Sequence, residues 1–194
     1  MHPPLIVLAS TSPYRRDLLA RLRLPFEVRA PAVNEVALPG EAARATALRL
    51  AQAKARAVAP DCPAALIIGC DQVAVLDAVS LGKPGNHANA VVQLRAMRGR
   101  SVLFHTALAL FNARTGASQT AEVPTTVRFR RYGDAEIERY LEVERPYDCA
   151  GSAKIEGLGI VLVESVHSID PTALIGLPLI ELSAMLRNEG VAVV

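Results

Sequence analysis

Hydroxyl and cationic side chains meet in the stretch LASTSPYRR, where a short apolar run gives way to a helical pattern. Pro13 follows Ser12, which is typical of a helix that begins with a serine cap and a proline. The first turn of a helix has unpaired N–H groups and the positive end of the helix dipole, so it attracts anions. With Ser10, Arg15 and Arg16 added, the stretch favours phosphate binding over the alternative, a capped helix with solvated arginines.

Two carboxylates are candidates for a metal site or for activating a water molecule. Asp71 follows the apolar strand AALIIG, and carboxylates at the ends of buried strands commonly serve ligands in α/β folds. The alternative for Asp71 is an Asx turn that caps the strand. Glu35, in the loop VNE, is a second candidate for facing the metal, and its alternative is an ordinary exposed acid.

Lysine is scarce, because the chain has 18 arginines and three lysines. An ammonium is a compact point charge and a guanidinium is a wide planar fork, so the lysines that remain are candidates for sites that arginine cannot fill. Lys54 lies on the apolar stripe of a helix, and Lys83 lies in the tight loop LGKPG. Lys154 and Glu156 share the loop GSAKIEG and face either a ligand or only water. Chance survival of the lysines is the alternative.

The hydrophobic pattern predicts the elements that must position these residues. Helices are expected over 13–22, 41–60, 89–99, 133–144 and 177–190. Extended segments are expected over 5–9, 25–31, 64–69, 101–113, 123–132 and 160–166. Because strands and helices interleave without a linker, we expect one mixed α/β domain over residues 1–194.

Composition narrows the class of protein. Half of the 194 residues are apolar, which is enough for a sizeable core, and a net charge of +2 does not suggest a nucleic-acid-binding protein. The three cysteines form no CxxC motif, which argues against a zinc site and a disulfide framework. The sequence shows no signal peptide and no apolar run long enough to span a membrane, so we expect a cytoplasmic protein.

Seven motifs, in order and in register, resemble the Maf-type nucleoside triphosphate pyrophosphatases over nearly the whole chain: LASTSPYRR, VNE, AQAKA, IIGCDQV, GKP, CAGSAKIEGLG and DPTALIGLPL. The resemblance implies hydrolysis of nucleoside triphosphates to monophosphates and pyrophosphate with a divalent cation such as Mg²⁺ or Mn²⁺. It also implies a two-lobed, mixed-sheet α/β fold similar to that of inosine triphosphatases, with a central cleft, and members that are often homodimers. No nucleic-acid or membrane partner is expected.

Three positions resemble the branch of the family that is specific for 7-methyl-GTP. They are Tyr14 before the double arginine, Gln72 after the aspartate and Glu156 in KIEG, where the branch acting on dTTP and UTP carries Arg, Thr and Gln. Tyr14 itself departs from the tryptophan that is common in this branch. Asn34 replaces the usual Asp, which leaves Glu35 as the carboxylate of that loop, and Cys70 replaces a small residue.

The resemblance implies a role for each candidate residue. Asp71, helped by a metal that Glu35 and Asp71 hold, activates the water that attacks the α-phosphorus, and Lys54 and Lys83 stabilise the leaving pyrophosphate. Substrate binding falls to the remaining residues: Ser10, Ser12, Tyr14, Arg15, Arg16, Gln72, Lys154 and Glu156. We rank Arg16 below Arg15, since Arg16 has a structural ion pair as its alternative. The implied biological role is the removal of modified nucleotides before they reach nucleic acid.

Two other functions stay open at this point. One is an inosine-triphosphatase-like enzyme for deaminated purines, which performs the same chemistry on another base. The other is a non-catalytic nucleotide-binding regulator of cell division. Turnover of ITP against 7-methyl-GTP separates the first from the main hypothesis, and pyrophosphate release separates the second.

Overall fold

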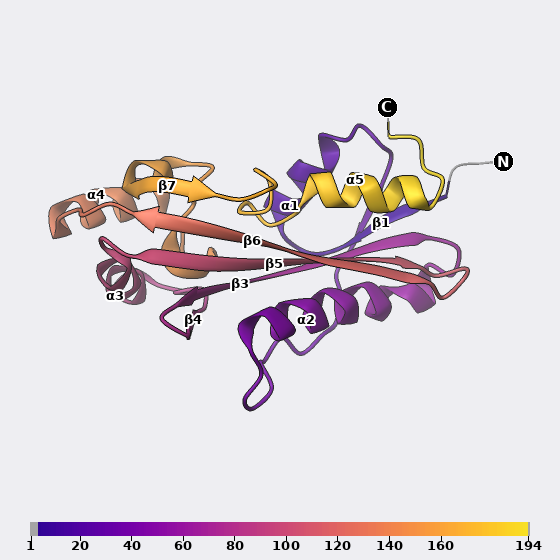
Figure 1. Ribbon diagram of the computed structural model, residues 1–194, viewed down its shortest axis with the longest axis horizontal. Helices are drawn as coiled ribbons and strands as arrows, with labels where there is room; N and C mark the ends of the chain where they lie inside the picture. The colour runs from indigo at the N-terminus through magenta and orange to yellow at the C-terminus, as the bar shows by residue number, and fades with distance from the viewer. Residues whose placement is uncertain (1–3, 194) are drawn as a thin grey trace. The chain divides into compact units, whose positions relative to one another are not determined.

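The computed structural model describes residues 4–193, which form a mixed seven-stranded sheet and five α-helices (Figure 1). The strand order is β2-β1-β3-β5-β6-β7, and β4 pairs with β3. The chain divides into two compact units. Within the described residues, unit 1 comprises 4–71, 106–123 and 170–193, and unit 2 comprises Gln72–His105 and Pro124–Ile169. The mixed α/β class expected from the sequence is confirmed.

Unit 1 is built on a parallel part of the sheet. Strand β1 (Ile6–Ala9) pairs in parallel with β2 (Glu27–Arg29) and with β3 (Leu66–Leu76). Its three helices are α1 (Pro13–Ala20), α2 (Ala43–Val58) and α5 (Leu179–Asn188). An apolar cluster joins leucines of α1 and α5 to alternate residues of β1, β3 and β5 (Ser101–Asn112). This packing fixes the position of β1 and of the first half of β3, which leads to Asp71.

Helix α2 packs very closely against β3 at Gly69. A Cβ atom added to Gly69 would lie 2.0 Å from the carbonyl oxygen of Ala51 and 2.8 Å from the amide nitrogen of Ala55. Only glycine fits here, because both contacts are with backbone atoms that cannot move aside. The close approach brings the turn of α2 that carries Lys54 directly against the strand that carries Asp71.

Unit 2 contains two antiparallel pairs of the sheet. Strand β4 (Val79–Leu81) pairs with the end of β3, and β6 (Ser118–Phe129) pairs with β7 (Val163–His167). The helices of this unit are α3 (His87–Met97) and α4 (Asp134–Glu144). Short 3-10 segments lie at Ala59–Asp61 in unit 1 and at Ala150–Ser152 and Leu158–Leu162 in unit 2. None of the helices described is long and apolar enough to cross a lipid bilayer.

Three element predictions were wrong in their bounds. Strand β3 does not end at Gly69 but continues to Leu76, because its later residues pair with the unpredicted strand β4. Strand β6 begins at Ser118 rather than at residue 123. The expected strand over 160–166 begins as the 3-10 segment Leu158–Leu162, so β7 starts at Val163.

Candidate active site

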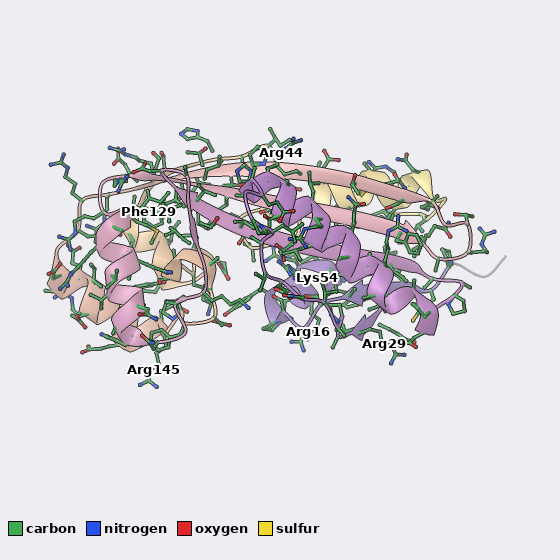
Figure 2. The ribbon with its side chains drawn as sticks, turned by 90° about the horizontal axis from the view of Figure 1, so that it is seen from below. Arg16, Arg29, Arg44, Lys54, Phe129 and Arg145 are labelled. Carbon is green, nitrogen blue, oxygen red and sulfur yellow. The ribbon has the colours of Figure 1, made fainter. Side chains whose placement is uncertain are left out.

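A buried lysine joins two carboxylates in unit 1. The Nζ atom of Lys54 lies 2.7 Å from Oδ1 of Asp71 and 2.9 Å from Oε1 of Glu35. Lys54 is 4% exposed and Asp71 is 6% exposed, whereas the side chain of Glu35 is 59% exposed. Figure 2 labels Lys54 on helix α2 and Arg16 near the lower border of the view. The cluster therefore combines a protected ion pair with one carboxylate that reaches solvent.

The surroundings of Asp71 act on its pKa in two opposite directions. Burial raises the pKa of Asp71, and the charge and hydrogen bond of Lys54, followed by the charge of Arg15, act in the opposite direction. Lys54 occupies Oδ1, and among the described residues none donates a hydrogen bond to Oδ2. That second oxygen is available to a water molecule or a cation.

The position of Asp71 follows from the pairing of β3. Parallel pairing of β3 with β1 ends at Ala9 and Gly69, and antiparallel pairing with β4 begins at Ala74. Asp71 lies between these two pairings, inside a continuous strand. The sequence placed the carboxylate after the end of a strand. The structure corrects this, because what ends near Asp71 is the neighbouring strand β1.

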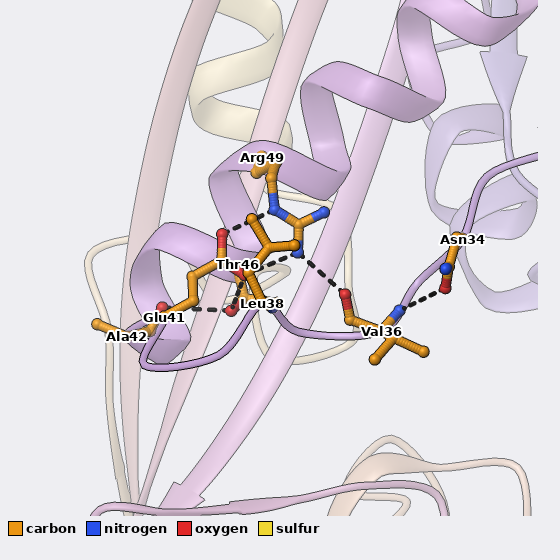
Figure 3. A network of polar contacts seen from close by, with 7 residues as sticks. All are labelled: Asn34, Val36, Leu38, Glu41, Ala42, Thr46 and Arg49. Carbon is orange, nitrogen blue, oxygen red and sulfur yellow. Dashed lines mark hydrogen bonds and ion pairs between the residues drawn. The ribbon is translucent and has the colours of Figure 1, made fainter.

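A network of polar contacts shapes the loop that carries Glu35 (Figure 3). Both oxygens of Glu41 accept hydrogen bonds from Arg49, at 2.7 Å each, and the same carboxylate accepts from the Leu38 amide and the Thr46 hydroxyl. The Nη2 atom of Arg49 also donates to the carbonyl of Val36 at 3.2 Å. Helix α2 thus holds the loop one residue beyond Glu35.

The pKa values of Glu41 and Arg49 are both shifted in the direction that favours their charged forms. The hydrogen bond from Arg49, followed by that from the Leu38 amide, lowers the pKa of Glu41 to about 2. The same contact raises the pKa of Arg49, with a smaller contribution from the charge of Asp71. Both groups therefore stay ionised through the neutral and mildly acidic range.

The start of α1 is organised as the sequence predicts. Ser12 caps the helix, its hydroxyl accepting from the Arg15 amide at 3.4 Å, and the hydroxyl of the buried Ser10 accepts from the Ser12 amide at 3.1 Å. Tyr14 is half-buried. Arg16 forms an exposed pair with the adjacent Asp17 at 3.1 Å. Arg15 and Arg16 therefore have different surroundings, and only Arg15 is tied to a distant part of unit 1.

Arg15 is held by the loop that precedes α5. Its Nε atom donates to the carbonyl of Gly176 at 2.9 Å, and the thiol of Cys70 donates to the same oxygen at 2.8 Å. Gly176 has a φ of +123°, a conformation that favours glycine. The buried Asp170 fixes this loop by accepting hydrogen bonds from Thr172 and from the Ile180 amide at the start of α5.

Four further predicted site residues lie in unit 2. Gln72 is half-buried on β3, and Lys83 is exposed on the loop between β4 and α3. The Nζ atom of Lys154 pairs with Glu144 of α4 at 2.7 Å. The protein around the exposed Glu156 raises the pKa of its carboxyl by desolvation, and Lys154 opposes that shift.

A sequence profile of the family described as Maf-like protein matches residues 5–189. The chain belongs to the Maf family. It is 62% identical over 191 residues to the 7-methyl-GTP pyrophosphatase of Paraburkholderia xenovorans. The aligned region covers 97% of this chain and 93% of that protein. It is 61% identical over 192 residues to the protein of the same name from Methylobacillus flagellatus, covering 99% of this chain and all of that protein. The resemblance recognised in the motifs is confirmed.

In this Maf protein the structure groups the predicted residues by unit. Unit 1 carries Glu35, Lys54 and Asp71, which are in direct contact, and the residues at the start of α1. Unit 2 carries Gln72, Lys83, Lys154 and Glu156.

Residue types and spacing did not assign the partners that hold the proposed site: Glu41, Arg49, Glu144, Asp170 and Gly176. The motif DPTALIGLPL contained the signal for the last two, since a buried acid before a glycine loop is typical of a helix cap. Glu41 and Arg49 carried no such signal, because charges on a helix are usually solvated.

Proposed function

We propose that this Maf protein hydrolyses 7-methyl-GTP to 7-methyl-GMP and pyrophosphate. The observation that carries the proposal is the buried Asp71, held at Oδ1 by Lys54 with Oδ2 available, in a chain about three-fifths identical to proteins of that name. A carboxylate in this setting suits proton abstraction from water.

In the proposed reaction Asp71 takes a proton from a water molecule at Oδ2. The water oxygen forms a bond to the α-phosphorus, and the bond from that phosphorus to the bridging oxygen breaks. Pyrophosphate leaves with the electron pair of that bond, so negative charge grows on the former bridging oxygen. Lys54, Arg15 and Lys83 supply positive charge to it, which is the positioning and electrostatic stabilisation that phosphoryl transfer requires.

In this proposal different residues bind the phosphates and recognise the base of the substrate. Ser10, Ser12, Arg15 and the first amides of α1 bind phosphate oxygens, as a capped helix start does. Arg16 has a lesser part, because Asp17 already neutralises it. Base recognition falls to the residues that distinguish the branch: Tyr14, Gln72, Lys154 and Glu156.

The carboxylates of Glu35 and Asp71 fit a divalent cation. Both lie within 2.9 Å of one ammonium, so they are close together, and Mg²⁺ is commonly held by one or two carboxylates plus substrate phosphates. No group of three or more potential ligands occurs in the described residues, so the other ligands would be water and phosphate. A bound Mg²⁺ or Mn²⁺ would supply Lewis-acid stabilisation of the phosphoryl oxygens.

A nucleotide panel with pyrophosphate detection tests the proposal. We expect purified protein with Mg²⁺ or Mn²⁺ to release pyrophosphate from 7-methyl-GTP faster than from GTP, ITP, UTP or dTTP. Preference for ITP would favour the enzyme for deaminated purines. Nucleotide binding without pyrophosphate release would favour a regulator.

Replacing Arg49 by methionine should slow pyrophosphate release roughly 10- to 100-fold, the usual cost of losing a residue that orients a metal-binding carboxylate. Arg49 clamps Glu41 and the Val36 carbonyl, so its loss frees the loop that carries Glu35. The measurement is kcat for 7-methyl-GTP together with the Mg²⁺ concentration at half-maximal rate. Arg44→Met is the matched control, because Arg44 is 65% exposed on the same helix and pairs with Glu122 rather than with the loop that carries Glu35. Equal kcat values for the two variants would show that the function of Glu35 does not depend on Arg49.

Replacing Glu156 by glutamine should lower turnover of 7-methyl-GTP more than turnover of UTP. Methylation at N7 makes the guanine ring cationic, and a carboxylate attracts that charge while accepting from N1–H and the exocyclic amine. Glutamine loses the charge and turns one acceptor into a donor. Lys154, a cation of the same loop, pairs with Glu144 of α4.

Tyr14→Ala should also reduce the preference for 7-methyl-GTP, because it removes a ring that stacks on the cationic base. Such contacts are worth roughly 0.5–2 kcal/mol, which is about 2- to 30-fold in KM. The measurement for both variants is kcat/KM with 7-methyl-GTP, GTP and UTP, and Glu142→Gln, an exposed acid of α4, is the control. Unchanged ratios in both variants would remove these two residues from base recognition while leaving the phosphate chemistry intact.

A further inference from the structure

One glutamine of α3 touches two loops of unit 2 at once. The Nε2 atom of Gln93 donates to the carbonyl of Gly82 at 3.0 Å, and its Oε1 atom accepts from the hydroxyl of Ser152 at 2.6 Å. Gly82 precedes Lys83, and Ser152 begins the segment that leads through Lys154 to Glu156. The side-chain amide of Gln93 therefore links the loop of Lys83, proposed to bind phosphate, to the segment of Glu156, proposed to recognise the base.

The loops also meet through their backbones at the same place. The amide of Gly151 donates to the carbonyl of Gly82 at 3.3 Å, so that oxygen accepts from both Gly151 and Gln93. A Cβ atom added to Gly151 would lie 3.6 Å from Sδ of Met97. This junction is compact, and a shift of either loop would be transmitted to the other.

Ser152 is held in a conformation that serine does not favour. Its φ is +57°, following +70° at Gly151, and it is fully buried. A left-handed residue other than glycine persists only where its surroundings fix it. The hydroxyl of Ser152 is bound by Gln93, and its carbonyl accepts from the hydroxyl of Tyr140 at 3.2 Å.

We propose that Gln93 is a positioning residue that sets the placement of Lys83 relative to the Lys154–Glu156 segment. The proposal rests on the proposed function, because it takes Lys83 as a phosphate-binding residue and Glu156 as the base-recognising residue. The primary amide of glutamine can donate to a carbonyl through its nitrogen and accept from a hydroxyl through its oxygen at the same time. Glutamate would place an acceptor against the Gly82 carbonyl, and methionine would make neither bond.

The test compares Gln93→Met with Ser152→Ala and with the double variant. In Gln93→Met we expect kcat for 7-methyl-GTP to fall and the preference for 7-methyl-GTP over GTP to narrow, each by about ten- to a hundredfold, as for small misplacements in such sites. Gln93→Glu keeps the acceptor for Ser152, so it should lower kcat while largely keeping the preference. Because Gln93 and Ser152 act through one bond, the double variant should lose no more preference than Gln93→Met alone.

Asn89→Ala is the matched control. Asn89 lies on the same helix and donates to the carbonyl of Pro84 at 3.0 Å, so it touches the Lys83 loop alone. It should lower kcat without changing the preference between the two guanine nucleotides.

Amide hydrogen exchange supplies a readout that does not depend on turnover. In Gln93→Met, exchange should rise together in segments 82–85 and 152–156, and in Asn89→Ala only in the first. A folded Gln93→Met protein with unchanged kcat, preference and exchange would overturn the inference, as would losses that multiply in the double variant. Wild-type protein that releases no pyrophosphate from 7-methyl-GTP would instead overturn the proposed function, and exchange would still decide the role of Gln93.

Discussion

Asp71→Asn should reduce kcat for 7-methyl-GTP hydrolysis by roughly 10²- to 10⁴-fold, the usual cost of losing a general base. Asparagine keeps the size and shape of aspartate, and its amide oxygen can still accept from Nζ of Lys54, which lies 2.7 Å from Oδ1. It cannot take a proton from water, and it is a poorer cation ligand. Nucleotide binding should largely persist, because the residues at the start of α1 are unchanged.

The control for this variant is Asp61→Asn, which removes an exposed carboxylate of the same unit. Single-turnover measurements with 7-methyl-GTP separate the chemical step from binding, and thermal unfolding checks that both variants are folded. Turnover by Asp71→Asn equal to that of Asp61→Asn would exclude Asp71 from the mechanism.

Local pattern predicted those parts of the fold that depend on neighbouring residues. The helix after Ser12 begins where the serine and proline place it, and the amphipathic segment before Glu144 forms α4 as expected. Strand β3 shows the limit of such a reading. Its residues are all buried through Asp71, and burial alternates only from Val73 on, where the partner changes from β1 to β4. A change of partner is a tertiary event that the local pattern does not fix.

In the site, the sequence predicted which residues are candidates but not which residues they contact. The sequence identified Lys54 from the apolar stripe of its helix, Asp71 from the end of an apolar run and Arg15 from the start of a capped helix. It did not identify what holds Arg15, because Gly176 lies 161 residues further along the chain. Nor did the sequence show that Lys154 would pair with Glu144, since the family pattern specifies the loop and not the helix beside it.

Lys54→Arg should lower kcat by about 10²-fold although the positive charge is kept, because small misplacements at such sites carry a cost of that size. The ammonium contacts carboxylates from two different elements, Glu35 at 2.9 Å and Asp71 at 2.7 Å, which suits a compact charge. A guanidinium is a planar fork that binds one carboxylate side by side. The close packing of Gly69 against the backbone of α2 leaves little spare room between helix and strand for the larger group.

The effect of shape can be separated from the effect of charge with two further variants. Lys54→Met removes the charge and leaves the buried Asp71 unpaired, so it should lower the melting temperature more than Lys54→Arg does. Arg44→Lys makes the reverse exchange at a side chain that is 65% exposed on the same helix, and it should change neither kcat nor stability. If Lys54→Arg turned over 7-methyl-GTP as fast as Arg44→Lys, the site would require only a positive charge. The scarcity of lysine in this chain would then carry no information about position 54.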